Sequence, residues 1–401
     1  MINDTSSKKE FGSHEWLLLV SSVIILLIGV AFIYSARYTT ESDDGFPWYQ
    51  KYYVKQIIFY SMGLSAAIVI NLLDYHSWAR WALVGYWTSI ILLLLVPVIG
   101  VSAGGAQRWI DVGFFNFQPS EVAKIAFILM LASFLSRPME ELRLVGNFWK
   151  AIGMLLLPFV LIMAEPDLGS ALVLIPVGLV MMFVGGIPPR FLTRLVGGVG
   201  IVMILLLLNI LFAPKSWQIA LHEYQRQRLL VYFGMDFAGE GATQAEKRAA
   251  EKLQDEKSYQ VRQALISVGS GGVWGTGWLE GQQTALHYLP PGAAHNDFIF
   301  SVIAEETGFV GSLTLIILYG AILFTGISIA SQARDRLGKL LAVGVVTLVF
   351  SQVFINIGMN IRIMPVTGVP LPLLSYGGTS AIVSLVAIGM LHNVHLYRRV
   401  Y

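Results

Sequence analysis

The stretch from Trp16 to Ser35, WLLLVSSVIILLIGVAFIYS, decides the class of fold. It contains no charged side chain, and it is as long as the ~20 apolar residues with which a helix crosses the ~30 Å core of a bilayer. Because lipid offers no partner for an unpaired backbone group, such a segment has to be helical. The stretch therefore predicts a transmembrane helix.

Working outward from this stretch, nine further segments of similar character follow. The ten predicted spans are Trp16–Ser35, Val54–Leu73, Ala79–Ile99, Ser120–Leu135, Phe148–Ala164, Leu168–Gly185, Phe191–Phe212, Phe298–Ala330, Leu340–Asn360 and Ser375–Leu396. A transmembrane β-barrel would instead show alternating segments of about ten residues. The sequence thus predicts an all-α integral membrane protein with about ten transmembrane helices.

The composition supports the same class. Of 401 residues, 55% are hydrophobic and 13% are charged, whereas a soluble domain has about 25% charged residues. This excludes a soluble enzyme, a disordered chain and a fibrous protein. The net charge of +2 is too small to indicate a nucleic-acid partner, and the absence of Cys excludes disulfides and cysteine-based metal sites.

Lys and Arg residues gather in the short connections on one side of the predicted spans, the side that also holds both ends of the chain. Positive charge favours the cytoplasm. We therefore expect a cytoplasmic tail (1–15), seven spans (16–212), one long extracytoplasmic connection (213–296), and then three spans with a short cytoplasmic tail (297–401).

The long connection has two parts of different composition. Residues Gly239–Gln263, which include the charged insert 239–257, are rich in helix formers of mixed charge and predict a solvent-exposed helix. Residues Ile266–Ala294 are rich in Gly, Trp and Pro and predict irregular backbone. Their glycines resemble a phosphate loop, but no Gly-Lys-Ser/Thr follows.

Charged groups inside a span are costly, so they mark candidate functional sites. In the motif Phe117–Lys124, Pro119 suits a first helical turn, where Glu121 meets the positive end of the helix dipole. Lys124 lies three residues further on the same face and predicts an ion pair with Glu121. The pair either fixes helix packing or lines a site for an anionic head group.

Two irregular segments also stand out. Glu165-Pro166-Asp167 is either a simple turn or, if it is buried, a pair of carboxylates that line a cavity or meet cations. The prolines and glycines between Asn360 and Gly378 exclude a regular helix. Such backbone is tolerated at membrane depth only where protein or water covers it, so it predicts a re-entrant or cavity-lining loop.

The tetrapeptide His295-Asn296-Asp297-Phe298 begins the eighth span. An aspartate in this position either caps the helix or, beside a cavity, acts as a general base. Glu305 and Glu306 follow in the same span, and for them we expect a structural role in pairing.

Taken together, these motifs resemble the SEDS family (shape, elongation, division and sporulation). The resemblance rests on Gly105–Ile110, Phe117–Lys124, Glu165–Ser170, Gly275–Trp278, Asn296–Phe300 with Glu305–Glu306, and Pro370–Gly378, in order along nearly the whole chain. Within the family, Gly105–Gly113 and Tyr224–Arg228 resemble the RodA branch more than the FtsW branch.

The resemblance implies a peptidoglycan glycosyltransferase of the bacterial plasma membrane that joins lipid II units at the outer face, together with a class B penicillin-binding protein. Asp297 matches the essential carboxylate of the family. Glu121, Lys124 and Asp167 match polar positions around a central cavity, and Gln118 belongs to the same motif.

The implied reaction needs groups that neutralise a leaving pyrophosphate. Arg108, Lys124, Arg228 and Arg262 are the candidates. A divalent cation such as Mg²⁺ or Mn²⁺ is an alternative, with no residue assigned to it. The residues before Asp297, Gly292–Asn296, depart from the usual basic-plus-Thr flank of the family.

Two other functions remain open on the residues alone. A flippase for lipid II or another polyprenyl-linked glycan would need charged groups along the whole crossing, and the inner halves of these spans carry few. A scaffold that only positions a penicillin-binding protein would not need Asp297.

Overall fold

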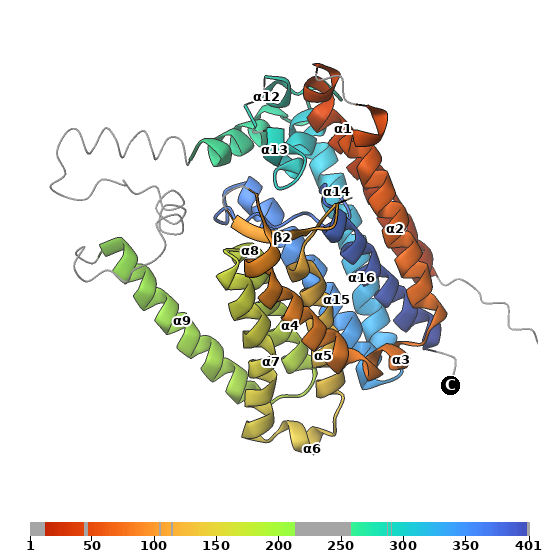
Figure 1. The fold of residues 1–401 in the computed structure, drawn as a ribbon, viewed down its shortest axis with the longest axis vertical. Coiled ribbons are helices and arrows are strands. Elements are labelled where there is room, and N and C mark those ends of the chain that lie inside the picture. The colour runs from red at the N-terminus through yellow and green to blue at the C-terminus, as the bar shows by residue number, and fades with distance from the viewer. Residues whose placement is uncertain are drawn as a thin grey trace, which may run out of the picture.

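A computed structural model describes residues 13–43, 47–103, 106–113, 115–212, 258–286, 288–289 and 291–398. The chain forms an upright bundle of helices (Figure 1). Its elements are α1 (Ser13–Asp43), η1 (Trp48–Gln50), α2 (Tyr52–Leu72), α3 (Tyr75–Arg80), α4 (Ala82–Ile99), β1 (Val101–Ala103), β2 (Ala106–Asp111), β3 (Asn116–Phe117), α5 (Pro119–Leu135), α6 (Met139–Leu142), α7 (Val145–Ala164), α8 (Leu168–Val184), α9 (Pro189–Phe212), α12 (Gln282–Ala285), α13 (Pro291–Ala294), α14 (Ile299–Gln332), α15 (Arg336–Asn360) and α16 (Gly378–Tyr397).

Each of the ten predicted spans coincides with one long helix of the structure. Among the described residues, eight helices are long and apolar enough to cross a membrane. The other two, α5 and α8, have 17 residues each. Two boundaries needed correction. The predicted span Ala79–Ile99 is interrupted at Trp81, which is not helical and separates α3 from α4. The predicted span Ser375–Leu396 begins three residues too early, because α16 starts at Gly378.

The helices α15 and α16 form the centre of the bundle. In their most apolar windows, 67% and 78% of the residues are buried within the protein. Helix α16 packs along α2, and α14 packs between α1 and α15. Helix α9 stands apart from the bundle (Figure 1), and only 6% of its window is buried. Its apolar surface is therefore left for lipid or another membrane segment.

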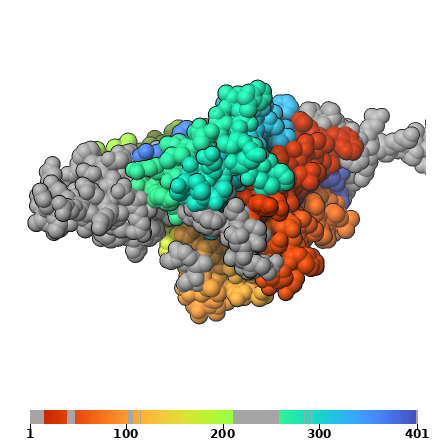
Figure 2. Space-filling model, turned by 90° about the horizontal axis from the view of Figure 1, so that it is seen from above, coloured from red at the N-terminus to blue at the C-terminus, as the bar shows by residue number. Residues whose placement is uncertain are grey.

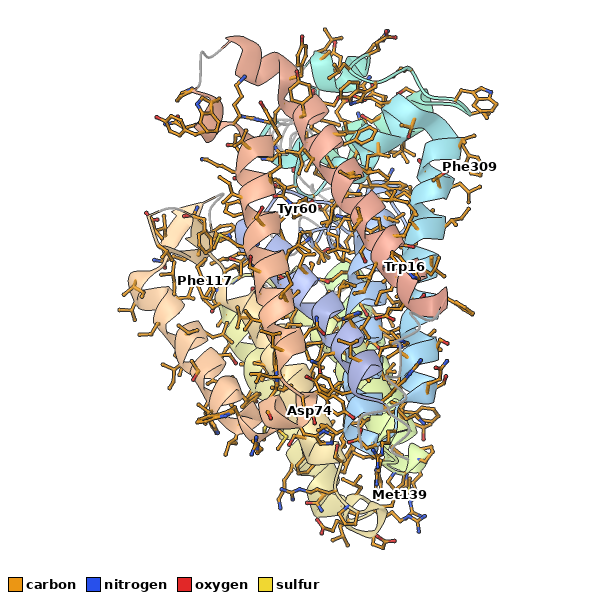
Figure 3. All side chains as sticks on the ribbon, turned by 90° about the vertical axis from the view of Figure 1, so that its right-hand side faces the viewer. Trp16, Tyr60, Asp74, Phe117, Met139 and Phe309 are labelled. Carbon is orange, nitrogen blue, oxygen red and sulfur yellow. The ribbon has the colours of Figure 1, made fainter. Side chains whose placement is uncertain are left out.

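We use "upper end" for the end of the bundle that carries β2, α12 and α13 in Figure 1, and "lower end" for the end that carries α3 and α6. Figure 2, seen from above, shows the segment that begins at residue 258 spread over the middle of the upper end. Figure 3 places Asp74 and Met139 at the lower end and Tyr60 inside the upper half. All parts of the site described below belong to the upper end.

The all-α prediction missed a small sheet at the upper end. The strands β1, β2 and β3 are antiparallel in the order β1-β2-β3. They cover the stretch between α4 and α5, which contains the predicted site residue Arg108. The sheet fixes the direction in which the side chains of β2 point.

The segment after the long connection differs in part from its prediction. Residues 258–270 are helical, which extends the predicted helix beyond Gln263 into the stretch 266–270 that was expected to be irregular. The rest of Ile266–Ala294 forms turns with the short helices α12 and α13. Most of the charged part of Gly239–Gln263, including the insert 239–257, lies outside the described residues.

Helix α14 is broken at Gly308, which has φ 67° and ψ −160°. The residues 271–281 dock at this break. Phe309, at the bend in Figure 3, donates its N–H to the carbonyl of Gly272 at 2.9 Å, and Gly277 donates to the carbonyl of Glu306 at 3.0 Å. The loop thus holds α14 on both sides of the break.

Candidate active site

A cavity of about 810 Å³ opens at the upper end of the bundle. Polar and aromatic side chains from distant parts of the sequence surround it. The lining comprises Tyr52, Lys55, Phe59, Arg108, Trp109, Asp111, Gly113, Phe115, Asn116, Gln118, Gln260, Gly292, Asn296, Asp297, Phe298, Val366, Thr367, Gly368, Pro370, Tyr376, Gly377, Gly378, Thr379 and Ser380. A concave site with aromatic walls and a few charged groups is typical of small-molecule binding.

The irregular segment between α15 and α16 forms one wall of this cavity. Val366, Thr367, Gly368 and Pro370 line it, while Leu371, Leu373 and Leu374 are buried in the protein. The carbonyl of Leu373 accepts a hydrogen bond from Tyr60 Oη at 2.6 Å. The prediction of a cavity-lining loop is therefore confirmed.

Asp297 lies in the turn between α13 and α14, and it lines the cavity. It does not have the alternative role of a helix cap, because the N-cap of α14 is Phe298, whose carbonyl accepts from the N–H of Ser301 at 2.9 Å. The cap position is thus occupied by an apolar residue. The structure therefore places Asp297 at the wall of the cavity, one residue before the N-cap of α14.

The backbone of this turn is held from below by two buried asparagines of α15. Asn356 Nδ2 donates to the carbonyl of Asp297 at 3.0 Å and to that of Val369 at 2.8 Å. Asn360 Nδ2 also donates to the carbonyl of Asp297, at 3.2 Å, and its Oδ1 accepts from Ser301 Oγ at 2.6 Å. These bonds fix the start of α14 relative to α15 and to the cavity loop.

The same turn is tied to the start of α16. Ser375 Oγ donates to the carbonyl of Asn296 at 2.7 Å, and the N–H of Tyr376 donates to the carbonyl of His295 at 3.0 Å. The rings of His295 and Tyr376 both contact that of Tyr52, with centroids 4.7 Å and 4.8 Å away. The wall that carries Asp297 and the wall made by α2 and α16 therefore form one connected unit.

Arg108 lines the cavity but is already engaged by the connection between α7 and α8. Its Nη2 donates to the carbonyl of Pro166, and its Nη1 lies 4.0 Å from Asp167 Oδ1. Asp167 is 2% exposed, caps α8 through the N–H of Ser170, and accepts from Gln118 Nε2 at 3.0 Å. The structure thus brings together three predicted site residues, Arg108, Gln118 and Asp167, of which Asp167 lies behind the cavity lining.

Glu165 is the second carboxyl of this connection, and it is 2% exposed. Burial, followed by the negative charge of Asp167, raises its pKa from 4.5 to about 8, against the effect of Arg108. Of the two interpretations from sequence, the buried turn that meets a cation describes this segment. Glu165 itself is not among the residues that line the cavity.

Glu121 and Lys124 form the predicted ion pair, with Nζ and Oε1 2.6 Å apart and both side chains 1% exposed. Neither residue is among those that line the cavity. Both residues lie on α5, so the ion pair joins two positions of the same helix. A substrate could contact them only if the cavity extended further into the bundle. Their assignment to substrate binding stays a prediction.

The structure does not place the other two predicted cations, Arg262 and Arg228, in the cavity lining. Arg262 lies on the exposed side of the helix 258–270 and is not among the lining residues, whereas its neighbour Gln260 is. Arg228 lies outside the described residues. Within the described part of the chain, no group of three or more His, Asp or Glu side chains is placed to hold a metal ion.

Several lining residues were not singled out from the sequence. Tyr52, Lys55 and Phe59 lie on one face of α2, and Asp111 belongs to β2. Their spacing of three and four residues gave a signal of a shared helix face. Lys55 falls at the start of the predicted span Val54–Leu73, and nothing in the sequence shows that this face of α2 looks into a cavity.

Fold and site together define a class: a multi-pass membrane protein with a polar cavity at one end of its helical bundle. A protein-family model described as "Cell cycle protein", for FtsW, RodA and SpoVE, matches residues 15–400. The chain belongs to this family, which is the SEDS family expected from its motifs.

Known relatives match over nearly the full length. The chain is 35% identical to the peptidoglycan glycosyltransferase MrdB of Escherichia coli K12, over 99% of this chain and 98% of that protein. It is 34% identical to stage V sporulation protein E of Bacillus subtilis, over 96% and 98%. Identities this close in two branches assign the family but not the branch.

Solved structures share the fold. A chain described under "Structural coordination of polymerization and crosslinking by a peptidoglycan synthase complex" has a TM-score of 0.75 and 28% identity, covering 96% of this chain and 99% of that one. The rod shape determining protein RodA of Thermus thermophilus has a TM-score of 0.64 and 26% identity, over 96% and 98%.

Proposed function

We propose that this protein is a peptidoglycan glycosyltransferase that polymerises lipid II into β-1,4-linked glycan strands, with Asp297 as the general base. The observation that carries the proposal is the position of Asp297, whose carboxyl lines a polar cavity at one end of an otherwise apolar bundle. A sugar on a membrane-embedded lipid would be presented at that depth. The names of relatives over the full length support the same activity.

The reaction needs one base and one good leaving group. Asp297 takes the proton from the 4-hydroxyl of the acceptor sugar, and the oxygen attacks the anomeric carbon of the donor. The bond from that carbon to the diphosphate breaks, and the lipid diphosphate leaves with the electron pair. One displacement converts the α-linked donor into a β-linked product. A positioned base contributes about 10²- to 10⁴-fold to such a step.

We further propose that the upper end faces the outside of the bacterial plasma membrane and that both termini are cytoplasmic. The protein would work with a class B penicillin-binding protein, which cross-links the peptides. The description of a structural relative as part of a peptidoglycan synthase complex supports this partner. Tyr224–Arg228 and Gly105–Gly113 favour the RodA branch, and with it a role in cell elongation.

The test is polymerisation of purified lipid II by the purified protein and its cognate penicillin-binding protein. Asp297→Asn keeps the shape of the side chain but removes the base, so strand synthesis should fall by at least about 100-fold. Glu280→Gln is the matched control, since Glu280 is an exposed carboxylate of the upper end that does not line the cavity.

Glycan strands from the Asp297→Asn variant at the unsubstituted rate would refute the assignment of the base. Strands from neither protein, with both folded, would favour a flippase and call for a leaflet-translocation assay. A scaffold predicts that the Asp297 variant still supports growth of a depleted strain.

A further inference from the structure

The charged side chains that line the cavity are few. Two are carboxyls, Asp111 and Asp297, and two are cations, Lys55 and Arg108. If the proposed function holds, the cavity has to neutralise the diphosphate of the donor as it leaves. A cation can do this only if its side chain is not already bonded to another group of the protein.

Three of the cations considered so far are poor candidates in this structure. Arg108 donates to the carbonyl of Pro166 and lies 4.0 Å from Asp167. Lys124 is committed to Glu121 at 2.6 Å, away from the cavity lining. Arg262 is not among the lining residues.

Lys55 differs from all of these. Its side chain makes no hydrogen bond or ion pair with the residues that the structure describes, and it is only partly exposed. It lies on the same face of α2 as Tyr52 and Phe59, which line the cavity with it. A half-buried ammonium group without a carboxylate partner is a suitable ligand for an anion.

The surroundings hold Lys55 close to the start of α16. The next residue, Gln56, is fully buried; its Nε2 donates to the carbonyl of Ser375 at 3.2 Å, and its Oε1 accepts from the N–H of Gly377 at 3.3 Å. Gly377, Gly378, Thr379 and Ser380 line the cavity, and no side chain caps α16. The positive end of a 20-residue helix therefore adds to the charge of Lys55.

The same region is joined to the proposed base. Ser375 Oγ donates to the carbonyl of Asn296, the residue before Asp297. A cation on α2 and a carboxyl on the turn before α14 thus belong to one hydrogen-bonded framework. Such a framework can hold a leaving group and an attacking hydroxyl in a fixed relation.

We propose that Lys55 binds the diphosphate of the lipid-linked donor, beside the uncapped start of α16. This inference rests on the proposed function. It assigns to Lys55 the role for which the sequence offered Arg108, Lys124, Arg228 and Arg262.

The experiment compares Lys55→Met, which removes the ammonium group and keeps an unbranched side chain one atom shorter, with Lys55→Arg and with the unsubstituted protein. Lys51→Met is the matched control, because Lys51 lies one turn earlier on the chain and does not line the cavity. For lipid II polymerisation, kcat/KM should fall about 10- to 100-fold in Lys55→Met, as expected for loss of a charge-assisted contact. Lys55→Arg should recover most of it.

A second readout would not respond to a merely structural role. Farnesyl diphosphate and farnesyl monophosphate are titrated into the purified protein, and binding is measured directly. The unsubstituted protein and Lys51→Met should prefer the diphosphate, and Lys55→Met should lose about tenfold in affinity for it. Equal binding and equal kcat/KM in Lys55→Met would overturn the proposal.

The two proposals fail in different ways. If the unsubstituted protein makes no strands, the proposed function fails, and the titration alone decides the role of Lys55. If it makes strands and Lys55→Met behaves as the Lys51 control does in both measurements, only the assignment of Lys55 fails.

Discussion

The position of Asp297 is fixed through hydrogen bonds to its backbone. Its carbonyl accepts from Asn356 and Asn360, both of which are fully buried. Leaving a buried carbonyl unpaired costs about 1–3 kcal/mol. The asparagines of α15 therefore set the position of the proposed base through its backbone carbonyl.

This arrangement predicts the effect of Asn356→Ala. The variant removes one of the two donors to the carbonyl of Asp297 and the donor to that of Val369. Both stability and kcat should fall, with kcat lower by roughly 10- to 100-fold because the proposed base is misplaced. KM should change little. Thermal unfolding and lipid II polymerisation measure the two effects.

Asn393→Ala is the matched control for this prediction. Asn393 is also buried, and it donates to the carbonyls of Ile70 and Leu73 at 2.9 and 2.8 Å, on the α2 and α16 pair away from the cavity. It should lose similar stability and keep its kcat. A parallel loss of kcat in both variants would contradict a positioning role for Asn356.

Among individual residues, the sequence predicts best those contacts that join neighbours along the same helix. The Glu121–Lys124 pair follows from helical spacing and was found as expected. The role of Lys55 could not be predicted, because it depends on which face of α2 meets α16 and the turn at Asp297. Those contacts join residues more than two hundred positions apart, and no short-range pattern encodes them.

At the scale of elements, the docking of residues 271–281 on α14 depends on the lack of side chains at its glycines. A Cβ on Gly275 would lie 2.1 Å from the carbonyl oxygen of Glu306, and a Cβ on Gly308 would lie 2.3 Å from the N of Gly275. The carboxyls of Glu305 and Glu306 accept from the N–H groups of Gln283 and Leu279 at 2.8 and 3.2 Å. The structural role expected for these two carboxyls is thus to bind the backbone of the loop to α14.

Gly275→Ala should therefore release the loop. Both Gly275 and Gly272 have positive φ, 83° and 53°, but nothing lies within 4 Å of a Cβ on Gly272. Gly272→Ala should cost about 1 kcal/mol from backbone strain alone, whereas Gly275→Ala should cost about 1–3 kcal/mol more from the clash. Thermal unfolding in detergent compares the two, and equal melting temperatures would contradict tight docking.

At the scale of the whole molecule, hydrophobic runs were enough to predict the number and order of the long helices. They were not enough to predict the sheet of β1–β3 or the position of α9, since short strands and the neighbours of a helix leave no periodic signal in the sequence. The cavity-lining loop was predicted because proline and glycine exclude a helix. The shape of the cavity itself comes from packing.

The orientation in the membrane can be tested directly, because the chain contains no Cys. Single cysteines at Glu280, exposed at the upper end, and at Met139, 46% exposed at the lower end, give two reporters. In intact spheroplasts, a membrane-impermeant maleimide should label the cysteine at 280, and it should label the one at 139 only after permeabilisation. The reverse pattern would place the cavity on the cytoplasmic side.

The break at Gly308 has a consequence for how the enzyme tolerates different bilayers. Membrane helices adapt to changes in hydrocarbon thickness by tilting. The loop is hydrogen-bonded to both sides of the break: Gly277 donates to the carbonyl of Glu306 above it, and Phe309 and Val310 donate to the carbonyls of Gly272 and Val273 below it. We therefore expect a change in the tilt of α14 to be passed on through this loop to the turn that carries Asp297, so that acyl-chain length should influence the shape of the cavity.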